Sequence, residues 1–269
     1  MQRREFLSFG SAIVLLGIPR TVLAQQPGTF SGLPQLEFFD AQRARLLSTF
    51  TFVDSRNQVW SVPRGYVTDG ASIPRFLWSL AGGPFSGLYR DAAIIHDHFC
   101  DSMARSWQAT HRVFYDGMLA RGVPKFEAQS KYRSVLYFGP RWDATHRWTS
   151  FLKINVMPRS AAATSPLRKS QKEAFAASIT ENKLAVYEAA DYERASQIIA
   201  AGDLEIEQVE AIEPAGTFNF ETEYAASLNE VEQVARFDER GQLLVPQQFI
   251  EERSFSNMLA NQGVAAPGM

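Results

Sequence analysis

Apolar and β-branched residues dominate two neighbouring stretches early in the chain, residues 46–53 and 59–67. Short runs of this composition are typical of β-strands. The segment between them, residues 54–57, is polar and has the composition of a turn. The pattern therefore predicts a β-hairpin.

The next part of the chain changes to helical periodicity. An amphipathic helix is predicted over residues 88–104, because apolar residues recur there at helical spacing: Leu88, Ala92, Ile95, Phe99 and Met103. Similar patterns predict helices over 107–121 and 124–138, and Gly122 ends the first of these.

The tail of the chain is mainly helical in pattern. A helix is predicted over about 168–201, with Asp191 as a candidate point of interruption, and a hairpin over 234–245 that turns at 239–241. Strands precede helices and do not alternate with them. We therefore expect an α+β fold. It consists of an N-terminal β-hairpin or small antiparallel sheet packed with a helical, motif-bearing core, and a mainly helical C-terminal extension.

Residues 1–24 have the pattern of an export signal. Arg3 and Arg4 precede the apolar run 9–18, and the segment ends in small residues of the kind that signal peptidase accepts. The arginine pair, followed one residue later by an apolar pair, resembles a twin-arginine signal; a general secretory signal and an uncleaved anchor are the alternatives. We expect a periplasmic or otherwise exported protein. The mature chain should lack a transmembrane span, because no apolar run reaches about 18 residues.

Composition divides the mature chain in two. Residues 25–157 carry 15 Lys and Arg against 10 Asp and Glu, whereas residues 158–269 carry 9 against 18. The Pro-bounded run 158–166 separates them. We expect a motif-bearing α+β domain over 25–157 and an acidic helical accessory region over 158–269, which is a candidate for binding a protein partner. The net charge of the whole 269-residue chain is −2, which gives no reason to expect nucleic-acid binding. Its single cysteine excludes an intramolecular disulfide.

The candidate chemistry lies among the histidines. His96 and His98 are two residues apart and cannot face the same way on a helix, whereas His96 and Cys100 share a face. His111 lies on the next helix and can meet His96 if the two helices pack antiparallel. His96, Asp97 and His111 could then hold Zn²⁺ or another divalent metal with a position left open for water. The alternative is a pair of hydrogen-bonded structural histidines.

A second candidate is Asp69, which lies in the polar turn 68–74 between a predicted strand and a predicted helix. Asp69 could orient or deprotonate a metal-bound water, and capping of the backbone is the alternative. Ser72 has the position of a helix cap. Cys100 fits a buried small apolar residue. The catalytic candidates are therefore Asp69, His96 and Asp97.

Four segments in order carry a resemblance to a known family: residues 62–75 (VPRGYVTDGASIPR), residues 92–97 (AAIIHD), Arg112-Val113-Phe114 with Met118 and Gly122, and Tyr137-Phe138-Gly139. Together they resemble the phage- and bacteria-associated domain-of-unknown-function family numbered 1353, over about residues 49–148. The chain has Thr110-His111 where the family usually shows an Ala-Asp pair, and Cys100 where an aromatic residue is usual.

The activity of this family is not established, so the resemblance indicates where such proteins occur and not which reaction they catalyse. Phage copies and an exported bacterial copy share the peptidoglycan wall as an evident substrate. We therefore expect an exported metal-dependent hydrolase of the cell envelope, such as a peptidoglycan amidase or peptidase, whose partner is a cell-wall polymer or other envelope component. A hydrolase of another anionic substrate is one alternative. The other is a non-enzymatic periplasmic protein with a structural His/Asp cluster.

Overall fold

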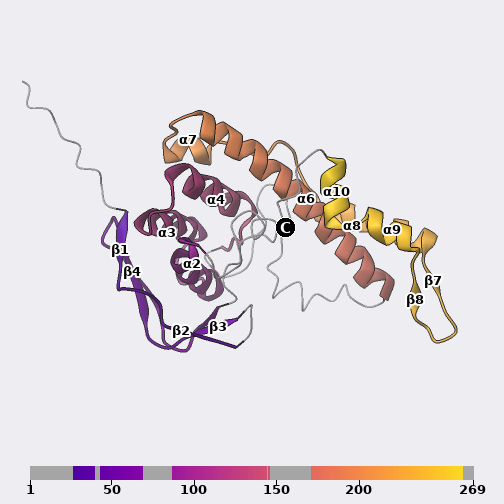
Figure 1. Cartoon of the computed structure of the whole chain (residues 1–269), viewed down its shortest axis with the longest axis horizontal. Coiled ribbons are helices and arrows are strands. Elements are labelled where there is room, and N and C mark those ends of the chain that lie inside the picture. Colours follow the sequence, from indigo (N-terminus) through magenta and orange to yellow (C-terminus); the bar gives the residue numbers. More distant parts are fainter. Residues whose placement is uncertain (1–26, 40–42, 69–86, 144, 146–170, 263–269) are drawn as a thin grey trace, which may run out of the picture.

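The computed structural model describes residues 27–39, 43–68, 87–143, 145 and 171–262. The expected signal 1–24, the expected linker 158–166, the candidate Asp69 and Ser72 all lie outside these ranges. The described part is an α+β structure, with small antiparallel sheets at the N-terminal end, a helical core and C-terminal helices, in agreement with the predicted fold class (Figure 1). None of the described helices combines the length and the apolar character needed to cross a membrane.

Two three-stranded antiparallel sheets form the N-terminal part, with strand orders β1-β4-β5 and β2-β3-β6. The bounds of their strands are β1 Gly28–Phe30, β2 Leu36–Phe38, β3 Ala44–Leu46, β4 Phe50–Asp54, β5 Val59–Val62 and β6 Val67–Thr68. The predicted hairpin is confirmed, because β4 pairs with β5. The predicted strand extents are wrong: each predicted strand splits into two that belong to different sheets. At Gly65, whose φ is +88°, the chain turns from one sheet to the other.

Asp54 holds the hairpin turn together. Its carboxylate accepts hydrogen bonds from the backbone N–H groups of Arg56 and Gln58, both at 2.9 Å, and from the indole Nε1 of Trp60 at 3.0 Å. Burial by itself would raise the pKa of Asp54, but the hydrogen bonds from Trp60, Gln58 and Arg56 outweigh it and hold the pKa below its usual value. The ionised form of Asp54 therefore stabilises this end of the sheet.

Alternate side chains of the β4–β5 hairpin point toward the helices. Phe50, Phe52 and Trp60 are at most 2% exposed, and they pack with Ile95 and Phe99 in one buried cluster. This alternation fits a sheet with one face against the core and one toward solvent. The cluster fixes the sheet on the surface of the helix that carries His96.

Three helices follow: α2 Arg90–Ser102, α3 Trp107–Ala120 and α4 Lys125–Phe138. They agree with the predicted helices to within two residues at each end. Met103, with φ of 49°, ends α2, and the Ser106 hydroxyl caps α3 by accepting from the Ala109 N–H. A Cβ added at Gly117 of α3 would lie 2.9 Å from the Cβ of Ala92, so α2 and α3 pack very closely there.

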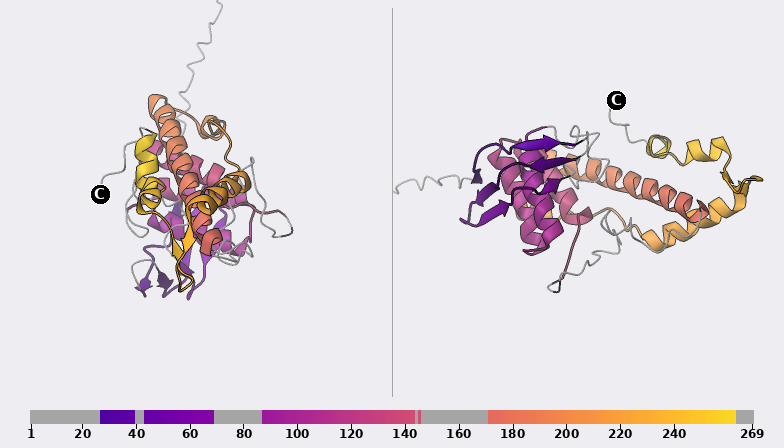
Figure 2. Two further views of the ribbon diagram at one scale, coloured as in Figure 1. Left: turned by 90° about the vertical axis from the view of Figure 1, so that its right-hand side faces the viewer. Right: turned by 90° about the horizontal axis from the view of Figure 1, so that it is seen from below.

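The tail contains the remaining elements: α6 Gln171–Ala201, α7 Ile206–Glu210, α8 Phe220–Val234, β7 Arg236–Phe237, β8 Leu243–Leu244, α9 Gln247–Glu252 and α10 Phe255–Asn261. The predicted interruption near Asp191 is wrong, because α6 is continuous through it. Asp191 is buried. Its carboxylate accepts hydrogen bonds from the side chains of Arg133 on α4 and Arg194 on α6, and not from the backbone of its own helix. Figure 2 shows α6 extending from the helical core into an arm that it forms with α8.

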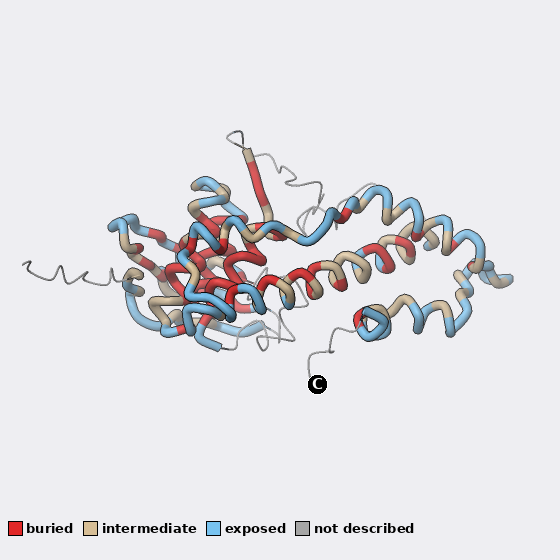
Figure 3. Tube along the Cα trace, turned by 90° about the horizontal axis from the view of Figure 1, so that it is seen from above, coloured by how far each residue is buried: buried red, intermediate tan, exposed pale blue. Residues whose placement is uncertain are grey.

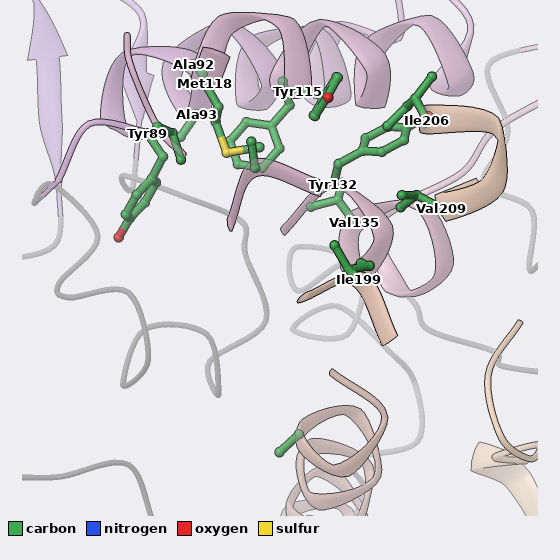
Figure 4. Close-up of a cluster of buried hydrophobic side chains, with 14 of the residues drawn as sticks. Tyr89, Ala92, Ala93, Tyr115, Met118, Tyr132, Val135, Ile199, Ile206 and Val209 are labelled. Carbon is green, nitrogen blue, oxygen red and sulfur yellow. The ribbon is translucent and has the colours of Figure 1, made fainter. Parts of the chain in front are cut away.

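Part of the tail packs against the helical core. A single buried cluster joins Met118 of α3 and Tyr132 of α4 to Ile199 of α6 and Val209 of α7 (Figure 4). Buried residues continue as a stripe from the core along α6 (Figure 3). The division that composition indicates between 25–157 and 158–269 is therefore not a division of the buried core.

Candidate functional site

The histidines of α2 and α3 meet in the interior. His96 is 3% exposed and His111 is fully buried. The closeness of Ala92 to Gly117, and of His96 to His111, shows that the two helices run antiparallel, as the short connection between them demands. His96 Nε2 lies 2.9 Å from His111 Nδ1, so one ring nitrogen of each residue points at the other.

Cys100 joins this pair from the next turn of α2. Its Sγ lies 3.5 Å from His96 Nε2 and 3.8 Å from His96 Nδ1, and the side chain is 3% exposed. One ligand atom each of His96, Cys100 and His111 lies within 4.8 Å of the others. Among the described residues this is the one group of three His, Cys, Asp or Glu side chains gathered closely enough to hold a metal ion.

Asp97 lies beside the cluster but is directed differently. Its Oδ1 is 3.7 Å from His96 Nδ1, the ring nitrogen that faces away from His111. Its Oδ2 accepts a hydrogen bond of 3.1 Å from the hydroxyl of Thr68, the last residue of β6. Asp97 therefore connects the end of the strand to the outer edge of the His96 ring.

Aromatic rings and the end of α4 surround His111. The rings of Trp107 and Trp142 lie 5.6 and 6.5 Å from its ring, centroid to centroid. A Cβ added at Gly139 would lie 3.1 Å from His111 Nε2, so the backbone closes tightly on that edge. Nε2 is buried and makes no hydrogen bond of ordinary geometry, although the Pro140 carbonyl approaches the ring.

Burial shifts the pKa values of two members of the cluster, His111 and Cys100. Burial lowers the pKa of His111 well below its usual value, and His96 and Arg141 lower it further, against the opposing effect of Pro140. Burial also raises the pKa of the Cys100 thiol well above its usual value, and Asp97 and Asp101 add to this.

The sequence prediction that His96 and His111 meet agrees with this arrangement, and Asp97 adjoins them as the third residue of the predicted set. Cys100 was predicted only as a buried small residue; its helical spacing of four from His96 was the available signal. Thr68 was not singled out. His98 faces Tyr66 and Phe99 instead of the cluster. Asp69 lies outside the described residues, so its predicted catalytic role stays a prediction.

The distances can be compared with those of a metal centre. Zinc takes nitrogen ligands at about 2.0–2.1 Å and thiolate at about 2.3 Å in tetrahedral geometry, which separates two nitrogens by about 3.3 Å and nitrogen from sulfur by about 3.6 Å. The observed separations are 2.9 Å between His96 Nε2 and His111 Nδ1, and 3.5 Å between His96 Nε2 and Cys100 Sγ. These two separations differ from those of such a centre by a few tenths of an ångström, and the ligand atoms of Cys100 and His111 lie within 4.8 Å of each other.

Comparison with known proteins identifies a family match without an activity. Residues 44–135 match the family model described as "Protein of unknown function (DUF1353)", which agrees with the resemblance found in the motifs. The matched range contains His96, Asp97, Cys100 and His111, and ends before Gly139. It does not include the tail.

Two relatives from Sinorhizobium fredii (strain NBRC 101917 / NGR234) are similar to this chain. The uncharacterized protein y4jT is 39% identical over 164 residues, which cover 60% of this chain and 49% of that protein. The uncharacterized protein y4iH is 45% identical over 103 residues, which cover 38% of this chain and 43% of that protein. The chain thus spans about half or less of the length of each of these two curated relatives. No solved structure matches it.

Proposed function

We propose that this protein is a metal-dependent hydrolase of the cell envelope, in which His96 and His111 hold a divalent metal ion such as Zn²⁺. The observation that carries the proposal is the approach of His96 Nε2 to His111 Nδ1 across two packed helices, at 2.9 Å and in full burial. Imidazole is a common side-chain ligand for metal ions, and two ligands on rigid helices give a site of fixed geometry.

A bound metal with a free position would supply the hydrolytic chemistry, because it lowers the pKa of a coordinated water to about 7 and polarises the bond to be cleaved. The residues of this chain would position that metal. Asp97 adjoins the outer nitrogen of His96 and would favour a proton there, which leaves Nε2 free to bind. Asp69 follows Thr68 in the chain and is the proposed general base.

The proposed substrate and location come from the sequence. The N-terminal segment 1–24 resembles an export signal, and a wall polymer such as peptidoglycan is a substrate that an exported bacterial copy and a phage copy of such a domain would both meet. In this proposal the acidic tail, residues 158–269, binds a further envelope component or protein partner. The proposed enzyme is an amidase or peptidase.

A second function has an observation in its favour. A separation of 2.9 Å between two ring nitrogens is also that of an ordinary hydrogen bond. In this alternative His96 and His111 join the two helices structurally, and the protein is a non-enzymatic envelope component.

Metal analysis and a wall-digestion assay distinguish these functions. The purified mature chain should contain about one equivalent of divalent metal and release soluble fragments from peptidoglycan sacculi. His96→Ala should lose both metal and activity with its circular dichroism spectrum unchanged. The matched control is His98→Ala on the same helix, whose ring packs on Tyr66, and it should keep both properties. A metal-free protein that is only destabilised by His96→Ala would support the structural alternative.

A further inference from the structure

We propose that the thiolate of Cys100, and not the carboxylate of Asp97, is the third protein ligand of this site, so that the site takes a thiophilic divalent ion of the Zn²⁺ or Co²⁺ class. This inference rests on the proposed metal site but not on hydrolysis, and it names the class of metal. Three features of the cluster support it: the directions of the candidate ligands, the groups beside the outer ring nitrogens, and the chemistry of the donor set.

The first part is direction. Cys100 Sγ lies 3.5 Å from His96 Nε2, the nitrogen that points at His111. Asp97 approaches the opposite ring nitrogen, with Oδ1 3.7 Å from Nδ1, and its Oδ2 is bonded to Thr68. An ion between the two imidazoles therefore meets Cys100 after a side-chain rotation, whereas Asp97 would have to break its bond to Thr68 and cross the ring.

The second part is what lies beside the two outer ring nitrogens. Nδ1 of His96 lies 3.7 Å from the carboxylate of Asp97. Nε2 of His111 is buried with no hydrogen bond of ordinary geometry, and the Pro140 carbonyl approaches that ring. The groups beside both outer nitrogens are therefore acceptors.

His96 Nε2 and His111 Nδ1 would hold a metal ion between the rings through their lone pairs, and each outer nitrogen would then carry a proton. The proton of His96 then points to Asp97, and that of His111 lies near the Pro140 carbonyl. This is the arrangement in which a ligating histidine donates its other N–H to a carboxylate or a carbonyl. It also gives Asp97 a role in positioning a ligand, which is incompatible with its being a ligand itself.

The third part is the donor set of two imidazoles and one thiolate. Thiolate selects Zn²⁺ and Co²⁺ over the hard ions Mg²⁺, Mn²⁺ and Ca²⁺, which take oxygen ligands. The negative charge of the thiolate also compensates part of the charge of an ion held by residues that are at most 3% exposed. Three protein ligands leave a fourth position of a tetrahedral ion for water or substrate.

Cobalt titration of the metal-free full chain tests this inference without any substrate. Co²⁺ should produce visible d–d bands of a tetrahedral site together with a near-ultraviolet sulfur-to-cobalt charge-transfer band, and Zn²⁺ should displace it while Mg²⁺ does not. Cys100→Ser and Cys100→Ala should lose the charge-transfer band. Asp97→Asn should keep the band and bind Co²⁺ about 10- to 100-fold more weakly, the usual effect of removing such a partner.

The outcomes separate this inference from the proposed function. A charge-transfer band in a protein that does not digest sacculi supports the inference and refutes the hydrolase. Binding of Co²⁺ without the band, unaffected by Cys100→Ala but abolished by Asp97→Asn, overturns the inference and leaves a metallohydrolase with the originally predicted ligands. Absence of Co²⁺ and Zn²⁺ binding in the wild-type chain overturns both.

Discussion

Replacing Asp191 by Asn tests whether the tail and the motif-bearing core fold as one unit. Asp191 of α6 is 3% exposed and forms an ion pair with Arg133 of α4, which is fully buried. Its other carboxylate oxygen accepts from Arg194 at 3.0 Å. Loss of one charge from a buried pair leaves the other uncompensated and costs about 3–5 kcal/mol. The free energy of unfolding should fall by this amount, a large part of the about 5–15 kcal/mol of a typical domain.

The positions of the tryptophans make the assay specific. All five lie between residues 60 and 148, so tryptophan fluorescence reports only on the motif-bearing core. Circular dichroism at 222 nm reports on all helices, including α6 and α8. Because α4 and α6 share one buried cluster, urea unfolding of Asp191→Asn followed by either signal should show the same lowered midpoint. A fluorescence midpoint equal to that of the wild type, with only the dichroism transition shifted, would refute the shared core.

Two further variants control for the chemistry of the substitution. Glu193→Gln alters an exposed carboxylate on the same helix, which accepts a hydrogen bond from Gln197 at 2.9 Å, and should change stability by less than about 0.5 kcal/mol. The double variant Arg133→Met with Asp191→Leu removes both charges and should recover much of the loss, since an apolar pair of similar volume can replace a buried ion pair. A double variant less stable than Asp191→Asn would mean that packing, and not the unpaired charge, causes the effect.

Three other predictions follow from the described contacts. Asp54→Asn should be less stable than the wild type at neutral pH. The difference should shrink as urea unfolding is repeated below about pH 4, because the lowered pKa of Asp54 makes its contribution present above the unfolded-state pKa and lost on protonation. Gly117→Ala should lower the melting temperature by pushing α2 from α3, since its Cβ would lie 2.9 Å from a side chain of α2; an unchanged melting temperature would show that the helices separate at no cost. Thr68→Val removes a hydrogen bond to Asp97 and should weaken zinc binding in a competition titration with the fold intact; unaltered affinity would mean that Thr68 does not hold Asp97 in place.

Local patterns predicted the parts of the fold that depend on neighbours in sequence. The helices over 90–102, 107–120 and 125–138 follow from periodicity and from the residues that end them, such as Gly122. The extents of the strands do not, because residues 46–53 and 59–67 are uniformly rich in strand-forming residues. The chain changes sheets within both stretches, and that change depends on pairing partners such as Tyr66 and Leu46, which are distant in sequence.

The candidate site divides in the same way. The meeting of His96 with His111 was predictable, because a short connection forces neighbouring helices to pack antiparallel. Helical spacing also places Cys100 on the same face of the helix as His96. The environment of Asp97 was not predictable, because its hydrogen bond to Thr68 at the end of β6 joins residues that are distant in sequence. A contact between the end of a strand and a helix cannot be predicted from the residue spacing within either element.

The long helix α6 shows which part of the interior composition does not reveal. Its first half packs against α8 through Ala176 and Ile179, and its second half against α4 through Asp191 and Ile199. The buried face of α6 therefore contacts two partners in succession, and it includes charged residues. For this reason the apolar pattern of the sequence is interrupted near Asp191, although the backbone of the helix is continuous. Acidic composition marks the solvent-facing surface of this region, whereas the buried pair of Asp191 with Arg133 joins it to the core. A boundary drawn from charge describes the surfaces of the two parts, whereas the second half of α6 packs into the same buried cluster as α3 and α4.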